Sequence, residues 1–307
     1  MKKESLLARR KTNLVVRARI IEAIRLFFTD RAFLEVETPI RIPAPAPETH
    51  IDAIPSDGWF LHTSPELCMK RMLAAGYEKL FQLTKCFRHY ERGSRHLPEF
   101  TMLEWYHGGI DYERLMAECE DLLIFISRYI GKGDSVTYQN RTVSLVKPWG
   151  RLSVREAFKR YSPLPLETVL ADDRFDEIMV TCIEPGMDSD RPVFLFDYPR
   201  PLGSLARLKR DDPTIAERFE IYAGGLELAN AFSELTDEEE QRSRFREERE
   251  QRVRLGKTEY PMPDRFLNDL SGMPEAAGIA LGVDRLVMFF TDSPSIDEVV
   301  AFTPEEL

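Results

Sequence analysis

Apolar residues recur at helical spacing in the clearest segments of this chain. Residues 13–31 carry such a pattern, which predicts an amphipathic helix with Asn13 as its N-cap. The apolar positions of its buried face are Val16, Ile20, Ile24, Phe27 and Phe28. Residues 111–130 predict a second helix of the same kind. Residues 236–254 are highly charged, which predicts a solvated surface helix rather than a binding site.

The charged segment has a defined start and internal support. Thr236 and Glu239 have the spacing of a capping box, whose two side chains satisfy free backbone N–H groups at a helix start. Acidic residues then precede basic residues by four positions, which is the favourable order along a helix. The pairs are Glu238–Arg242, Glu240–Arg244 and Glu248–Arg252.

Shorter segments have the alternation or the β-branched and aromatic content that predicts strands. They cover residues 32–40, 59–63, 79–88, 99–106, 219–235 and 278–283. A basic turn joins 79–88 to 99–106, so these two strands are expected to pair in antiparallel fashion. The proline-rich stretch 41–48 predicts a stiff connection, and 64–76 predicts a helix that ends at a glycine. We therefore predict an α+β fold in which helices back a mostly antiparallel sheet.

Composition narrows the class of protein. The chain has 307 residues, 43% of them hydrophobic and 31% charged, which is typical of a globular protein of one or two domains. Its four cysteines are scattered, which predicts reduced thiols rather than disulfides or a zinc site. The basic start lacks the apolar core of a signal peptide, and no apolar run is long enough to span a membrane, so we expect a cytoplasmic protein.

The charge of the chain is uneven. Its formal net charge is −10 and its pI is near 5.2, which argues against nonspecific binding of nucleic acid or membranes. Five basic residues nevertheless occur between positions 79 and 96 against one acid, Glu91. An arginine of this turn, Arg88, together with the distant Arg285, could clamp a polyphosphate, although either arginine alone is more often structural. No P-loop or dinucleotide-binding glycine pattern is present.

Two strands carry polar side chains on one face. Phe100, Met102, Glu104 and Tyr106 share one side of their strand, and Asn230, Phe232 and Glu234 share one side of another. Such a face fits a pocket for an ammonium-bearing ligand, or it is an ordinary solvated sheet face. Glu227 has the opposite parity to Glu234, so a bulge or bend is required before both could reach one metal ion.

Three segments, in order, resemble the signature motifs of class II aminoacyl-tRNA synthetases. The first helix with "FLEVETPI" (33–40) resembles motif 1, "FRHYERGSRHLPEFTMLEWY" (87–106) resembles motif 2, and "GIALGVDRLVM" (278–288) resembles motif 3. The likeness covers roughly residues 13–302. "TSPELCMKRML", "PEFTMLEWY" and "ELANAFSEL" are similar to the lysyl branch in particular. Three ordered motifs are far more specific than any one of them.

Within that branch, the chain is most similar to the short paralogues that join (R)-β-lysine to a lysine of elongation factor P. The first motif starts near Asn13, so we expect no anticodon-binding domain and a single catalytic domain over residues 1–307. Ala280 stands where the synthetases usually have glycine, as in the paralogues. We expect its methyl group to disfavour α-lysine and to favour β-lysine.

The resemblance also implies roles for individual residues. It implies that Arg88 holds the α-phosphate of ATP, that Phe100 stacks on adenine and that Arg285 meets the terminal phosphate. The full expected ATP site is Arg88, His89, Tyr90, Leu97, Phe100, Glu227, Leu228, Gly282 and Arg285. The expected amino-acid site is Ser64, Pro65, Glu66, Glu104, Tyr106, Asn230, Glu234 and Ala280. Glu227 and Glu234 are the implied Mg²⁺ ligands.

The same resemblance implies partners and a reaction. We expect ATP-dependent formation of an aminoacyl adenylate, transfer to elongation factor P rather than tRNA, and a homodimer formed through motif 1. Arg88 departs from the family pattern, because His89 and Tyr90 follow it and Glu91 comes one place late; Leu97 replaces an asparagine. Two alternatives stay open: a non-catalytic paralogue that binds lysine and ATP, and a stand-alone ligase similar to lysyl-tRNA synthetase.

Overall fold

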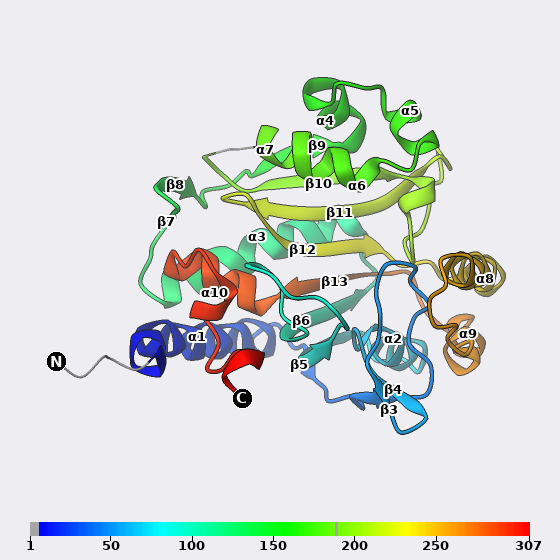
Figure 1. Ribbon diagram of the computed structural model, residues 1–307, viewed down its shortest axis with the longest axis horizontal. Coiled ribbons are helices and arrows are strands. Elements are labelled where there is room, and N and C mark those ends of the chain that lie inside the picture. Colours follow the sequence, from blue (N-terminus) through cyan, green and yellow to red (C-terminus); the bar gives the residue numbers. More distant parts are fainter. Residues whose placement is uncertain (1–5, 188–189) are drawn as a thin grey trace.

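A mixed eight-stranded sheet organises the computed structural model of this protein, which describes residues 6–187 and 190–307. In spatial order its strands are β1 (Leu34–Glu35), β5 (Lys79–Phe87), β6 (Glu99–Gly108), β13 (Ala276–Gly282), β12 (Leu226–Ser233), β11 (Ile215–Ala223), β10 (Val193–Pro199) and β9 (Gly150–Ser153). The five central pairings are antiparallel, and the two edge pairings, β1–β5 and β9–β10, are parallel. The predicted antiparallel sheet is therefore confirmed (Figure 1).

Two small sheets lie outside the main one. They are formed by β2 (Arg41–Ile42), β4 (Trp59–Leu61) and β3 (Pro55–Ser56), and by β7 (Ser135–Tyr138) and β8 (Arg141–Ser144). The predicted strand at 32–40 is wrong for most of its length, because only Leu34 and Glu35 pair with β5.

Three helices cover one face of the main sheet and build the largest core. These are α1 (Leu6–Thr29), α3 (Tyr112–Tyr129) and α10 (Val283–Thr291). The predicted apolar face of α1 is confirmed, because Ile20, Ile24, Phe27 and Phe28 are buried in this core and Val16 packs against it. These three helices do not cover the opposite face of the sheet, over which the candidate site lies.

The remaining helices lie around the edges of the sheet (Figure 1). The helix α2 (Glu66–Ala74) packs against β5 and β6, α9 (Asp264–Leu270) packs against α2, and α8 (Glu238–Arg254) packs against α9; residues of all three helices belong to a second core. Beside β9 and β10 lie α4 (Val154–Tyr161), α5 (Leu166–Ala171), α6 (Phe175–Ile178) and α7 (Glu184–Gly186), around a third core. A π-helix covers Met179–Ile183, and 3₁₀ turns cover Arg200–Leu202, Ile296–Glu298 and Pro304–Glu306. No helix of residues 6–187 or 190–307 has the length and apolar character needed to cross a bilayer.

Two predicted helix starts are wrong. Asn13 lies inside α1, and its side-chain amide donates hydrogen bonds to Ser293 Oγ (3.0 Å) and to the Glu298 carbonyl (3.1 Å). The cap of α8 is Asp237 rather than Thr236, because the Asp237 carboxylate accepts a hydrogen bond from the Glu240 N–H at 2.9 Å.

The charged helix α8 is only partly a surface helix. Two of its predicted i, i+4 pairs form, between Glu238 and Arg242 and between Glu240 and Arg244. The third does not, because Arg252 is fully buried and pairs with Asp52 at 2.7 Å. The α8 helix thereby holds the proline-rich connection and the residues that follow it.

A buried carboxylate ties the three signature segments together. Asp284, at the start of α10, accepts a hydrogen bond from Arg17 Nη1 of α1 at 2.5 Å and from the Thr101 N–H of β6 at 2.7 Å. Arg17 also donates to Thr101 Oγ1 at 2.8 Å. Because Asp284 is almost completely buried, this network fixes the position of its neighbour Arg285 relative to the sheet.

Candidate active site

A cavity of about 320 Å³ lies over the site face of the sheet, where the basic turn meets α10. The guanidinium of Arg88 lies 5.1 Å from the ring centre of Phe100, and both line the cavity. Nε of Arg88 is buried and has no hydrogen-bond partner within the described residues. A buried, unpaired donor beside an aromatic ring fits a phosphate linked to a stacked base.

Arg285 approaches the same cavity from α10. Its Nη1 donates to the Glu227 carbonyl at 3.0 Å and lies 3.3 Å from the Glu227 carboxylate. Its Nη2 lies 2.5 Å from the imidazole Nε2 of His96. Gly282 also lines the cavity, and a Cβ there would meet nothing nearer than 3.9 Å, so this side is open to a ligand.

The turn after Arg88 accommodates the extra residue found in the sequence. Tyr90 adopts a left-handed conformation (φ 66°), is 81% exposed, and stacks on His89 with ring centres 3.6 Å apart. The next residue, Glu91, lines the cavity and lies 3.8 Å from Arg88. The structure therefore brings Leu97 and Glu91 to the cavity, but it does not bring His89 or Tyr90 there.

Two charged residues of this cavity escaped the sequence analysis. Arg218 and Glu220, on β11, line it and form an ion pair at 2.7 Å. Arg218 Nε also donates to the Asn230 side chain at 3.0 Å. Burial, and then the nearby Glu227 carboxylate, raise the pKa of Glu220. Glu220 lies on the predicted strand 219–235, but Arg218 lies one residue before its expected start.

A β-bulge on β12 sets which side chains face the site. The pairing shifts between Ile221 and Tyr222, which oppose Ala229 and Glu227, so Leu228 is an extra residue. Glu227 and Asn230 therefore project to the same side although their numbers differ in parity. The bulge that the sequence analysis required is present, and Leu228 lines the cavity.

A second, smaller cavity of about 70 Å³ continues along the same face. Ser64 Oγ donates to Glu104 Oε1 at 2.5 Å, and the Tyr106 hydroxyl donates to Glu104 Oε2 at 3.0 Å. Pro65 precedes α2 at its N-cap position, and the Glu66 N–H donates to Ser64 Oγ at 3.0 Å. Burial, and then the Glu66 carboxylate, raise the pKa of Glu104 to about 8. Six of the predicted amino-acid residues, Ser64, Glu66, Glu104, Tyr106, Asn230 and Ala280, thus line one acidic pocket, whereas Pro65 and Glu234 do not line it.

Lys70, which the sequence analysis missed, is buried behind this pocket rather than in its lining. Its ammonium lies 2.6 Å from Glu66 and 2.5 Å from Glu234, and 4.9 Å from the ring centre of Phe232. Burial disfavours its charge, but the carboxylates of Glu234 and Glu66 overcome this and raise the pKa of Lys70. Oε1 of Glu234 is buried without a hydrogen-bond partner in the described residues, although Glu234 itself does not line the cavity.

The structure separates the two carboxylates expected to hold Mg²⁺. Glu227 lines the nucleotide cavity beside Arg285, whereas Glu234 pairs with Lys70 near the other end of the strand. The six or seven strand positions between Glu227 and Glu234 correspond to about 20 Å, so the two carboxylates are too far apart to bind one ion. No cluster of three potential metal ligands occurs in the described parts of the chain. Glu227 and Glu220 instead face one cavity, which fits an ion held by one or two carboxylates and substrate phosphates.

The two cavities meet at a small set of residues. Arg88, Met102, Asn230 and Ala280 line both of them, as does Glu48. Ala280 pairs with Glu104 on one side and Asn230 on the other, while Ile279, Leu281 and Val283 lie in the core. The prediction that Ala280 and Gly282 face the site, while the alternate residues of β13 pack in the core, is confirmed.

One glycine of β13 is required by the pocket. A Cβ at Gly278 would clash with the ring of Tyr106 and the carboxylate of Glu234. Only glycine leaves room for both side chains at this position.

Comparisons with known proteins give the family of this chain. A family model described as tRNA synthetases class II (D, K and N) matches residues 5–306. The elongation factor P--(R)-beta-lysine ligase of Proteus mirabilis (strain HI4320) is 39% identical over 94% of this chain and 94% of its own length. The protein of the same name from Pectobacterium atrosepticum is 39% identical over 95% of each chain. The lysine--tRNA ligase of Moorella thermoacetica is 38% identical over 94% of this chain, but over 64% of its own length.

Proposed function

Because the chain belongs to the class II tRNA synthetases of the D, K and N type, we propose that it activates (R)-β-lysine with ATP and joins it to elongation factor P. The acceptor group is a lysine side chain of that factor. One observation carries the proposal: an acidic pocket shares lining residues with a cavity into which Arg88 and Arg285 both project. Two alternatives were open, a non-catalytic paralogue that binds lysine and ATP and a ligase similar to lysyl-tRNA synthetase. No observation favours either of them.

The acidic pocket matches a substrate with two ammonium groups. Glu66 and Glu104 line the pocket, Glu234 is buried behind it, and Lys70 neutralises one of these three carboxylates. Two negative charges therefore remain when all the groups are ionised. A lysine-type amino acid supplies two positive charges and its carboxylate, which would point toward Arg88 at the junction.

The reaction requires positioning rather than a nucleophile from the protein. The substrate carboxylate attacks the α-phosphorus of ATP, an oxygen–phosphorus bond forms, and pyrophosphate leaves with the electron pair. Arg88 and Arg285 offset the negative charge that develops. Glu227, with Glu220 beside it, would hold a Mg²⁺ ion, which supplies further charge neutralisation when bound with the triphosphate.

The assembly and acceptor are part of the same proposal. The outer side of α1 and the segment after it expose Val15, Leu26, Leu34 and Ile40, which supports a homodimer through this region. We expect sedimentation to give twice the mass of one chain. The proposed reaction belongs to the cytoplasm, because its acceptor is an elongation factor.

The decisive experiment separates activation from transfer. Purified protein is incubated with ATP, Mg²⁺ and either α-lysine or (R)-β-lysine, and pyrophosphate exchange is measured. Elongation factor P and lysine tRNA are then offered as acceptors, and covalent product is detected by mass. We expect exchange with a lysine-type amino acid and modification of the factor. Efficient charging of tRNA without modification of the factor would overturn the proposal.

A further inference from the structure

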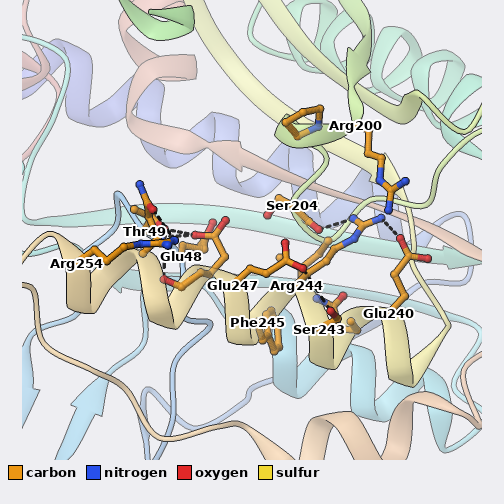
Figure 2. Close-up of a pocket in the computed structure, with 15 residues that line it drawn as sticks. Glu48, Thr49, Arg200, Ser204, Glu240, Ser243, Arg244, Phe245, Glu247 and Arg254 are labelled. Carbon is orange, nitrogen blue, oxygen red and sulfur yellow. Dashed lines mark hydrogen bonds and ion pairs between the residues drawn. The ribbon is translucent and has the colours of Figure 1, made fainter. Parts of the chain in front are cut away.

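A third cavity adjoins the two substrate cavities and has no role in the activation step (Figure 2). It is a groove of about 470 Å³ along α8, and we call it the α8 groove. Figure 2 shows Glu240 and Arg244 toward one end of it and Glu48, Thr49 and Arg254 toward the other. The residues that define it here are Glu48, Thr49, Ser204, Ser243, Arg244 and Glu247.

Glu48 connects this groove to the reaction centre. Among the described residues, it is the one side chain that lines the nucleotide cavity, the amino-acid cavity and the α8 groove. ATP and the amino acid occupy the first two cavities in the proposed reaction, and their reacting groups meet where these cavities join. Of these three cavities, only the α8 groove is therefore left for an acceptor to reach the carbonyl carbon of the adenylate.

We infer that the α8 groove admits the lysine side chain of the acceptor protein, and that Glu48 binds its ammonium and removes a proton from it. This inference rests on the proposed function and adds the acceptor route and the base. Glu48 would be a catalytic residue of the second step, in contact with the attacking nitrogen. The sequence carries it on the proline-rich connection, outside the three signature motifs.

The charges in the groove suit an incoming ammonium. Glu240 pairs with Arg244, and Glu248 accepts hydrogen bonds from Thr49. By contrast, neither Glu48 nor Glu247 forms an ion pair within residues 6–187 and 190–307. Both carboxylates line the groove, Glu247 along α8 and Glu48 at the junction. Arg200 and Arg254 also line the groove, so its carboxylates outnumber its basic groups by four to three, and an ammonium that enters meets two carboxylates that form no ion pair in the described residues.

The backbone at Glu48 is held in place while its carboxylate is not. Arg252 Nη1 donates to the Glu48 carbonyl at 2.7 Å, and the Thr49 N–H donates to Glu248 Oε2 at 2.7 Å. Both partners belong to α8. A fixed backbone with an unpaired carboxylate at a junction of cavities is the arrangement expected of a preorganised base.

The surroundings of Glu48 support proton transfer near neutral pH. Burial raises the pKa of Glu48 to about 7, Glu66 of α2 and Glu248 of α8 act in the same direction, and Arg88 and Arg218 oppose them. A lysine amine in water has a pKa of about 10.4, so it is almost fully protonated at neutral pH and cannot attack. A base whose pKa lies near the working pH is the effective choice for removing that proton.

The transfer step forms one carbon–nitrogen bond and breaks one carbon–oxygen bond. Glu48 accepts one proton from the acceptor ammonium, which leaves a lone pair on nitrogen. That nitrogen bonds to the carbonyl carbon of the aminoacyl adenylate, while the bond from this carbon to the phosphate oxygen breaks and AMP leaves with the electron pair. The second proton lost by nitrogen, and the proton on Glu48, pass to solvent through the groove.

The test compares two acceptors of the same adenylate. Hydroxylamine is small and largely uncharged at neutral pH, so it attacks the adenylate without a base and without filling the groove. We expect Glu48→Gln to lower the ratio of elongation factor P modification to hydroxamate formation by about 100-fold or more. The pH profile of the transfer rate should also lose its limb near pH 7, and Glu48→Asp should restore part of the rate.

Two further variants make the result decisive. Glu250→Gln makes the same chemical change at an exposed position of α8 outside the groove and should leave the ratio as in the wild type. Ser243→Trp fills the groove from an exposed position, and it should raise KM for elongation factor P more than KM for hydroxylamine. An unchanged ratio in both Glu48→Gln and Ser243→Trp would overturn the inference and leave the proposed function standing. Hydroxamate formation by a wild-type enzyme that never modifies the factor would overturn both.

Discussion

The ammonium of Lys70 and the carboxylate of Glu234 lie 2.5 Å apart, with 1% and 0% of their side chains exposed. Replacing Lys70 with Met would leave Glu234 and Glu66 as uncompensated charges inside the protein. We expect Lys70→Met to lower the free energy of unfolding by about 3–5 kcal/mol and to weaken binding of the amino acid. Urea denaturation and pyrophosphate exchange measure the two effects.

A matched control is available in an ion pair that is less deeply buried. Lys257 pairs with Asp52 at 3.1 Å but is more exposed, so Lys257→Met should cost about 1 kcal/mol or less. Equal losses in the two variants would contradict the structural role given to Lys70.

Arg285 is expected to be essential for activation. Arg285→Ala removes a guanidinium that faces the nucleotide cavity, and we expect the pyrophosphate-exchange rate to fall about 100-fold or more, as for a lost transition-state donor. Arg246→Ala, on the exposed side of α8, is the control and should behave like the wild type. Normal exchange in Arg285→Ala would remove this arginine from the proposed mechanism.

The turn after Arg88 gives a test of the cavity assignment. Tyr90→Gly relieves a left-handed backbone conformation and removes an exposed ring, so KM for ATP should change by about twofold or less. Glu91→Gln changes a carboxylate that lines the cavity 3.8 Å from Arg88 and should change KM for ATP by about 10-fold or more. The reverse order of effects would show that Tyr90, not Glu91, meets the nucleotide.

Ala280 is expected to select between isomers of lysine. Its methyl group lies at the junction of the two cavities, between Glu104 and Asn230 on the neighbouring strands. We expect Ala280→Gly to shift the ratio of kcat/KM toward α-lysine by about 10- to 200-fold, the usual effect of one methyl group in a pocket. Exchange with the two isomers, measured side by side, gives the ratio, and no shift would exclude Ala280 as the determinant.

The acidic pocket should couple amino-acid binding to pH. The pKa of Glu104 is raised to about 8, from 4.5 in an unfolded chain, so protonation favours the unliganded fold. The stability of the unliganded protein is therefore greatest at low pH on account of this group, and this contribution is lost as pH rises toward 8. An ammonium ligand requires the ionised form, so its affinity should rise between pH 6 and 8, by at most about tenfold per unit for one proton.

Calorimetry in buffers of different ionisation enthalpy measures this coupling as protons released on binding. Glu104→Gln should abolish the release attributed to this group. Affinity that is flat from pH 6 to 8 would contradict a protonated Glu104 in the free pocket.

The sequence allowed the sheet to be predicted because its signals are local. Alternation along β6 and β12 predicted which side chains share a face, and both predictions hold for Glu104 and Asn230. The first turns of α1 lack apolar periodicity. Long-range contacts help hold them, such as that of Arg10 with Glu306 at 2.6 Å, so the helix start was misplaced at Asn13.

The site residues that were missed depend on tertiary structure. Lys70 has the spacing of an ordinary surface pair with Glu66, and only the packing of α2 against the sheet places it beside Glu234. Conversely, Glu227 and Glu234 have suitable chemistry for one ion, but the length of β12 keeps them apart. The strand β11 begins at Ile215, but the predicted strand began at residue 219. With the true start, the alternation of Arg218 and Glu220 would have placed both side chains on the site face.

The bulge at Leu228 makes β12 sensitive to its length. One half of β12 carries side chains of the amino-acid pocket and the other half carries side chains of the nucleotide cavity. Both sets project to the same face only because the bulge places one extra residue, Leu228, between them. Substituting any one of these side chains alters one contact, whereas deleting Leu228 or inserting a residue beside it would turn one half of the set into the core. A one-residue insertion or deletion in β12 therefore separates amino-acid recognition from nucleotide recognition, which a substitution that keeps the strand length does not do.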